Sequence, residues 1–229
     1  MRRKSLFVMA AVIVLFSLQS CKSKPEEGLL KNYFHSVTLN DVMTMSTMAL
    51  EPLSIEAASW KITKVSEEKI EPATLPDLNK AELDAKKTEE GQRESVLAAK
   101  DALDAAKDEF DSARTGAAKA AAKKKVDDTQ IKFDDAYKAN AELKKAYNAA
   151  KATAAREEEI TSFSLAAGQL ANIRDLKGNV HSKEVGVEIK AKDGSAKNYR
   201  FFLRQYDLKD EALNLPHRGS WKIIKMEQV

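Results

Sequence analysis

Mostly apolar side chains recur at alternating three- and four-residue steps through the middle of the chain. The first stretch contains Val96, Ala99, Leu103, Ala106, Phe110 and Ala113, and the second contains Val126, Thr129, Phe133, Ala136, Asn140, Leu143, Tyr147, Ala150 and Ala154. This spacing keeps one seam of a helix turned toward a partner helix and is typical of a coiled coil. Thr115 and Gly116 separate the stretches, and Thr115 is suited to cap the second helix. The pattern predicts two helical arms within residues 77–159.

The two arms match each other best as an antiparallel hairpin with arms roughly 60 Å long. If the chain folds back at Gly116, Ala99 lies opposite Phe133, and most other layers also pair a large side chain with a small one. Gln92 then lies opposite Asn140, a polar pair that helps to fix the register. The alternative is one continuous helix that pairs with other chains, in which Gly116 costs about 1 kcal/mol.

The segment before the hairpin predicts two helices and a strand. Residues 29–39 place Leu30 and Phe34 on one face of a helix, and Asp41 is suited to cap a short helix that runs through residue 48. Residues 58–67 are predicted to form a strand around Trp60, Ile62 and Val65.

The segment after the hairpin predicts a further helix and an antiparallel sheet. The helix follows residue 160 and ends by residue 178, and residues 183–190 alternate as a half-buried strand does. Asp193 and Gly194 signal a tight turn, so that residues 199–206 return as the partner strand. The chain closes with one more apolar strand.

Together, residues 28–76 and 160–229 predict one α+β domain, with helices on a curved antiparallel sheet and the coiled-coil hairpin inserted between its two parts. The order of its elements, with a final Gly-Ser-Trp-Lys-Ile strand at residues 219–223, resembles the nuclear-transport-factor-like and ketosteroid-isomerase-like fold. Cystatin-like sheets wrapped on a helix share this pattern. The resemblance implies a cone-shaped pocket, for which Asp41, Tyr206 and Asp207 are the nearest acid–base candidates. Asp41 is equally explained as a helix cap and Asp207 as the polar end of a strand, and a fold alone does not fix a function.

The N-terminus has the layout of a secretory signal peptide. Arg2, Arg3 and Lys4 precede an apolar stretch at residues 6–18. That stretch has 13 residues, whereas a transmembrane helix needs about 20. We therefore expect residues 1–20 to be a cleaved leader.

Leu18, Gln19, Ser20 and Cys21 resemble the lipobox of bacterial lipoproteins, although Gln19 is larger than the usual residue. The resemblance implies cleavage before Cys21 and a lipid on its thiol, with three acyl chains such as palmitate on the mature end and a tether at residues 21–27. Cys21 is the only cysteine in the chain, so it has no internal disulfide partner, and lipid explains its presence in an exported protein. The alternative is an ordinary thiol beside an ordinary signal. By the sorting pattern of the lipoproteins that the sequence resembles, Lys22 after the cysteine implies the outer membrane, facing the periplasm, rather than the inner one.

Charge argues against a nucleic-acid partner. The leader holds three of the 38 basic residues and none of the 35 acidic ones, so the mature chain is formally neutral. A basic group stands near the proposed turn: Arg114, Lys119, Lys123, Lys124 and Lys125. Such a tip could contact anionic lipid, a cell-wall polymer or an acidic protein; the alternative is a solvated helix face.

No motif for a metal, cofactor or nucleophile is visible. His35, His181 and His217 are isolated from one another and from any cysteine at ligand spacing, and no glycine-rich phosphate loop is present. We expect a non-catalytic envelope lipoprotein that binds a partner protein or polymer, or acts as a spacer, through its hairpin. The alternatives are a small-molecule-binding or catalytic cone, and a structural oligomer whose coiled coil forms between chains.

Overall fold

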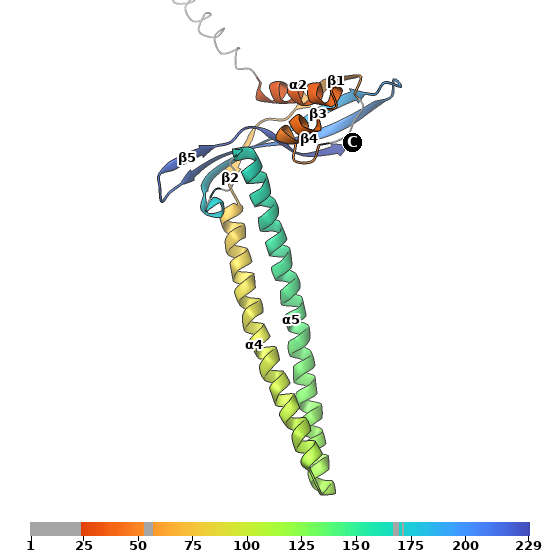
Figure 1. Ribbon diagram of the computed structural model, residues 1–229, viewed down its shortest axis with the longest axis vertical. Coiled ribbons are helices and arrows are strands. Elements are labelled where there is room, and N and C mark those ends of the chain that lie inside the picture. The colour runs from red at the N-terminus through yellow and green to blue at the C-terminus, as the bar shows by residue number, and fades with distance from the viewer. Residues whose placement is uncertain (1–23, 53–56, 167–169, 171) are drawn as a thin grey trace, which may run out of the picture.

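A long antiparallel helical hairpin projects from an α+β body in the computed structural model, which describes residues 24–52, 57–166, 170 and 172–229 (Figure 1). The elements of the body are α2 (Pro25–Thr38), α3 (Val42–Met48), β1 (Ser59–Val65), β2 (Lys69–Pro72), the 3-10 turn η2 (Ile173–Asp175), β3 (Lys177–Lys190), β4 (Ala196–Asp210), β5 (Leu215–Arg218) and β6 (Lys222–Gln228). The hairpin consists of α4 (Leu75–Ser112) and α5 (Gly116–Leu165). The predicted fold class is therefore confirmed.

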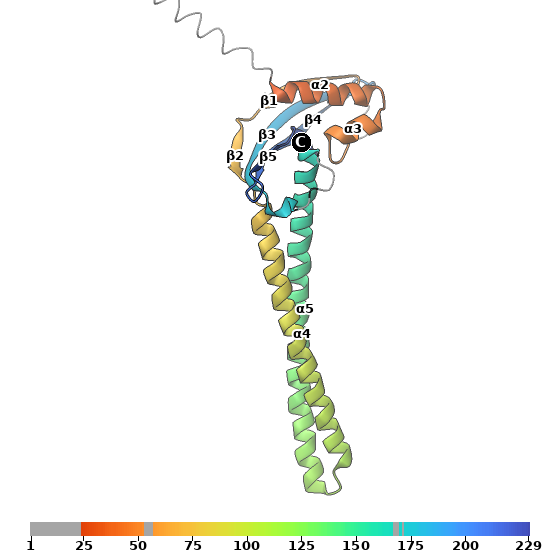
Figure 2. The same cartoon turned by 60° about the vertical axis from the view of Figure 1, so that its left-hand side comes forward.

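The sheet is antiparallel and strongly curled, so that it bends around the body end of α5 (Figure 2). β3 and β4 form its long central pair, in register from Lys177 opposite Lys209 to Lys190 opposite Ala196. β1 and β2 follow each other along the outer side of β3, while β5 and β6 both pair with β4. The predicted turn joins β3 to β4, and Gly194 in it has a φ of 84°, a conformation that glycine adopts without strain.

Both faces of the sheet are buried, but at different ends. Because successive side chains of a strand point to opposite faces, Val185 and Val187 of β3 pack with Phe201 of β4 beneath α2 and α3. Farther along the same strands, Val180 and Tyr206 point to the other face and pack against the base of the hairpin. The body therefore has two cores, and the sheet separates α2 from the hairpin (Figures 1 and 2).

The core beneath α2 is filled by aromatic rings. Phe34 stacks on Trp60 with 4.7 Å between ring centroids, and Tyr33 meets Phe34 and Phe201 edge-on at 5.5 and 6.3 Å. Tyr33, Phe34 and Phe201 are at most 1% exposed. Each such side chain contributes roughly 1.5–3 kcal/mol by leaving water, which makes α2 an integral part of the body.

Several sequence-based boundaries were wrong. The helix expected after residue 160 is the continuation of α5, because no helix breaker follows Glu159. α2 begins at Pro25, inside the expected tether at residues 21–27. β2 and β5 were missed, and β3 and β4 are longer than predicted, beginning at Lys177 and Ala196. The Asp41 cap is confirmed: its carboxylate accepts the Thr44 backbone N–H at 3.0 Å.

Candidate functional site

The hairpin is the most prominent feature of the molecule, and its turn forms as predicted. The chain reverses at residues 113–115, where the Thr115 hydroxyl accepts the Ala118 N–H at 3.2 Å and caps α5. Within the described chain, α4 therefore pairs with α5 of the same molecule, so the alternative of one continuous helix is wrong. At 1.5 Å per residue, the 38 residues of α4 make an arm about 57 Å long.

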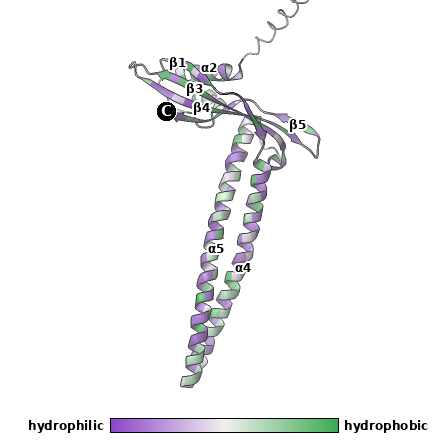
Figure 3. Cartoon of the chain, turned by 180° about the vertical axis from the view of Figure 1, so that it is seen from behind, coloured by the Kyte–Doolittle hydropathy of each residue, from purple (hydrophilic) through white to green (hydrophobic). Residues whose placement is uncertain are grey.

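The predicted seam lies between the arms. Leu103, Ala106 and Ala154 are buried, and the other seam positions are less exposed than their neighbours (Figure 3 shows the hydropathy along both arms). The predicted polar pair of Gln92 and Asn140 forms no hydrogen bond between its two side chains. The Gln92 amide donates to the backbone carbonyl of Ala136 at 3.3 Å, and the buried Asn140 Oδ1 accepts no hydrogen bond. Both residues still lie within one helical turn of the predicted register.

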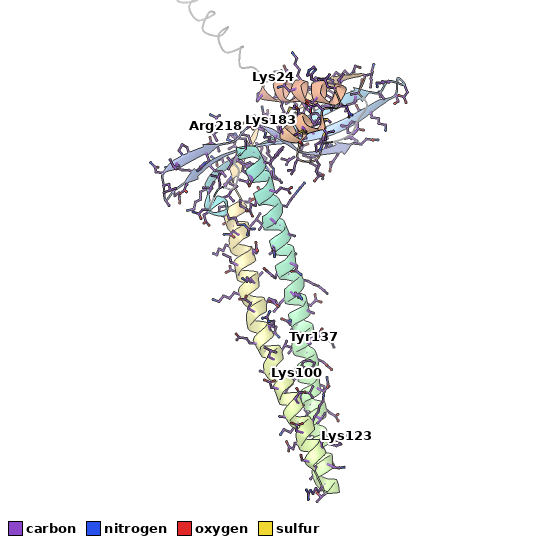
Figure 4. All side chains as sticks on the ribbon, in the orientation of Figure 1. Lys24, Lys100, Lys123, Tyr137, Lys183 and Arg218 are labelled. Carbon is purple, nitrogen blue, oxygen red and sulfur yellow. The ribbon has the colours of Figure 1, made fainter. Side chains whose placement is uncertain are left out.

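The tip of the hairpin is less basic than the sequence suggested. The residues Arg114, Lys119, Lys123, Lys124 and Lys125 are all exposed around the turn, as predicted (Figure 4 labels Lys123). The last turns of α4 stand beside them, however, and residues 108–125 contain five basic and three acidic side chains. Lys125 forms an ion pair with Glu109 across the arms. The tip is thus a mixed charged surface with a modest excess of positive charge.

The base of the hairpin carries three consecutive acids of α5, Glu157, Glu158 and Glu159, and the first two of them reach residues outside the helix. Each of them pairs with an arginine. Glu157 pairs with Arg204 of β4 at 3.0 Å, and Glu159 pairs with Arg156 at 2.8 Å. Arg156 also reaches Glu51 after α3, at 2.5 Å, so it ties the helix to the other part of the body.

Arg174, in η2, joins the two arms at their base. Its guanidinium donates to Glu158 of α5 and to Glu82 of α4, each at 2.7 Å, and to Asn79 of α4 at 3.3 Å. Both ion pairs are largely shielded from solvent, with at most 35% side-chain exposure. Planar, forked donation of this kind holds carboxylates more rigidly than a lysine could. This arrangement fixes how the arms leave the body.

Tyr206 lies under the same collar of ion pairs. Its hydroxyl donates to Glu157 at 2.6 Å and accepts from Arg204 at 3.1 Å. Burial raises the pKa of the Tyr206 hydroxyl above its usual value, and the adjacent Glu157 carboxylate raises the pKa further. Asp41 caps α3 at the surface and Asp207 is exposed, so the structure provides a packing role for Tyr206 and a capping role for Asp41.

Gly219 and Ser220 lock the end of α5 against β4. The Ser164 hydroxyl accepts the Tyr206 N–H at 3.2 Å and donates to the Ser220 carbonyl at 2.9 Å. A Cβ on Gly219 would collide with Ser164, which explains the glycine at this close approach.

A second charged cluster lies beside the first turn of α2. Lys183 of β3 forms ion pairs with Glu26 at 3.1 Å and with Glu68 at 3.5 Å, and its ammonium lies 5.5 Å from the centre of the Trp221 ring. Glu26 is only 4% exposed. His181 approaches Glu68 to 2.7 Å, and this hydrogen bond, assisted by Lys183, lowers the pKa of the Glu68 carboxyl. The cluster anchors the start of α2 to the sheet.

An open groove lies on the sheet. It has a volume of about 500 Å³ and is lined by Ser66, Lys69, Glu71, Glu184, Phe202 and Lys225, among others. Several of its charges are paired: Lys69 with Glu71 at 2.7 Å, and Lys225 with Glu227 at 2.5 Å. The groove is open and brings together no isolated acid–base pair.

The remaining candidates from the sequence are the lipobox, a membrane-spanning helix and the histidines. Cys21, with Leu18, Gln19 and Ser20, lies outside the described residues. None of the helices in the described part of the chain is long and apolar enough to cross a membrane. Among those same residues no three potential metal ligands come together; His35 is exposed on α2 and His217 lies in β5.

The comparisons with known proteins identify no relative. The chain matches no protein-family model, no curated protein and no solved structure.

Proposed function

We propose that this protein is a lipid-anchored component of a bacterial envelope that serves as a non-catalytic spacer or binding module through its hairpin. One observation carries the proposal. The chain enters the body at α2, and the hairpin leaves from the opposite face of the sheet, so Lys24 and Lys123 lie toward opposite ends of the molecule (Figure 4). An anchor on Cys21, three residues before Lys24, would hold one end at a membrane and present the tip away from it.

The junction supports a spacer because it resists bending. Glu157 pairs with Arg204 of the sheet, and Arg174 pairs with Glu158 of α5 and with Glu82 of α4. A flexible arm needs none of these contacts. A rigid arm of this length keeps its tip at a fixed distance from the body. Such an arm could set the distance between two envelope layers, or it could present the tip to a partner protein or cell-wall polymer.

A binding or catalytic cone receives less support. The order of helices and strands, with a curled antiparallel sheet, is compatible with a relation to the nuclear-transport-factor-like or cystatin-like folds. The space beneath α2, where such a cone would open, is occupied by the rings of Tyr33, Phe34 and Phe201. We therefore place the function in the hairpin.

The lipid anchor is tested by intact mass. Protein from bacterial membranes should begin at Cys21 and carry acyl chains, and the Cys21→Ala variant should lack them. An unacylated chain in the membrane fraction would refute the anchor.

The spacer is tested by changing length and tip chemistry separately. Deleting the whole of residues 77–159 would also remove Glu82, Glu157 and Glu158, whose ion pairs hold the hairpin base. The deletion must therefore lie within the arms and leave the base intact. Deleting residues 92–105 and 127–140 removes two heptads from each arm in register and shortens the hairpin by about 21 Å. The matched variant keeps the length but carries Lys119→Gln, Lys123→Gln and Lys124→Gln.

Each variant replaces the native chain in its own host. A spacer predicts that the shortened chain fails to restore the envelope phenotype of a strain lacking the protein, whereas the tip variant restores it. The reverse result favours binding through tip charge. If both variants restore the phenotype fully, the hairpin proposal is wrong.

A further inference from the structure

The outer face of α2 carries a small excess of positive charge. Lys24, Lys31 and His35 project from it, all exposed. Of the two acids of this helix, Glu26 is buried against Lys183, while Glu27 is exposed on the outer face and pairs with Lys24 at 3.4 Å. Such a face suits an anionic surface more than a basic one.

Three large apolar side chains are exposed where α2 turns into α3. Leu39, Val42 and Met43 are 63%, 57% and 83% exposed. Single exposed apolar residues are ordinary, but three within five positions concentrate apolar surface at one corner, where the exposed polar side chains of Asn40 and Asp41 stand between them. No described element covers this corner, which lies at the far end of α2 from the entry of the chain (Figure 2).

The tether before α2 is very short. Only three residue steps separate Cys21 from Lys24, and extended chain spans at most about 3.6 Å per residue. A lipid on Cys21 would therefore keep the start of α2 within about 11 Å of the membrane surface. The body, not merely a flexible leash, would then be in contact with the leaflet.

We propose that α2 docks along the anionic leaflet that holds Cys21, with the corner of Leu39, Val42 and Met43 inserted among the headgroups as a second point of attachment. This inference rests on the proposed lipid anchor. Two attachment points at opposite ends of α2 stop the body from swivelling, and the hairpin on the other side of the sheet then points away from the membrane. Interfacial apolar side chains beside basic ones are the usual means by which a surface helix binds lipid.

Site-specific fluorescence tests the docking in the full acylated chain. An environment-sensitive fluorescent amino acid replaces Met43, and the matched control replaces Leu213, which is 66% exposed on the β4–β5 turn. A second control replaces Ala120 at the hairpin tip. Each protein is inserted into vesicles of zwitterionic and anionic phospholipid that contain a nitroxide-quencher lipid.

If α2 docks, the emission at position 43 should shift to the blue, and the nitroxide lipid should quench most of its intensity. The emission at positions 213 and 120 should change little. Equal quenching at positions 43 and 213 would overturn the inference. The same chains can be coupled through Cys21 to a maleimide lipid, which supplies the tether even if cells do not acylate the protein. Failure of the anchor and failure of docking are thereby separated.

Discussion

At the scale of single residues, Glu157 joins the hairpin to the body through two residues of β4. Its carboxylate is only 13% exposed, and it accepts hydrogen bonds from both Arg204 and Tyr206. Because breaking such a shielded pair leaves one charge without its partner, the loss exceeds what the pair itself contributes.

Glu157→Gln should therefore lower the free energy of unfolding by about 1–3 kcal/mol, since the Arg204 charge remains partly buried without a counter-ion. The matched control is Glu142→Gln on the same helix, whose carboxylate is 72% exposed and pairs only with Lys145. That control should leave the urea midpoint unchanged, because exposed pairs contribute little. Equal midpoints for both variants would contradict the role of Glu157.

Tyr206 gives the protein a specific weakness at high pH. Its pKa is raised in the folded state, above the ordinary value of 10.0, so folding favours the protonated phenol. The stability that this provides is complete below pH 10.0 and declines as the pH rises above that value.

Urea unfolding between pH 8 and 11 should show the native chain losing more stability above pH 10 than Tyr206→Phe, which has no phenol to ionise. The stability gap between the two proteins should narrow as the pH rises. Tyr199→Phe, which keeps Tyr206, should follow the native chain. Parallel curves for the native chain and Tyr206→Phe would contradict the assignment.

At the scale of elements, local periodicity predicted the hairpin well. The seam and the Thr115 cap depend on residues within a few positions of one another, so their pattern is visible in the sequence. The Arg204–Glu157 pair joins residues 47 positions apart, and an acid in a highly charged helix is normally solvated. Nothing in the sequence singled out the acid run at residues 157–159.

The missed strands have a different cause. β2 and β5 have four residues each, and all or nearly all of their side chains are exposed, so they show no alternation of apolar and polar positions. Pairing with the long central strands forms them, which is a tertiary effect that a local pattern does not encode. The end of the hairpin was misplaced because the return of aromatic residues such as Phe163 resembled a new element, although no breaker interrupts α5.

Asn140 destabilises the seam of the hairpin. Its Oδ1 is buried between the arms without a hydrogen-bond donor. Asn140→Leu should raise the stability of the protein by about 1 kcal/mol, because the unpaired oxygen is replaced by apolar contact. Thermal unfolding followed by circular dichroism measures the gain. Asn148→Leu, at an exposed position of the same helix, should give none, and a destabilised Asn140→Leu would show that the amide is needed where it lies.

At the scale of the whole molecule, three features point in one direction. The chain enters through α2, the sheet lies behind it, and the collar of ion pairs directs the hairpin away from the opposite face (Figure 1). Each feature alone is compatible with many functions. Together they agree with the proposal of a membrane-anchored body whose arm projects from the opposite side.

This geometry predicts the height of the tip above a bilayer. A donor dye at residue 120 of the anchored chain should transfer little energy to acceptors at the leaflet surface, because an arm of about 57 Å and the thickness of the body lie between them. The chain shortened by two heptads brings the tip about 21 Å closer, so transfer should rise steeply. A Glu157→Gln, Arg174→Gln double variant should raise transfer as well, since a loosened base lets the arm lean toward the membrane. If the native and shortened chains transfer equally, the hairpin does not stand away from the membrane, and the spacer function loses its structural basis.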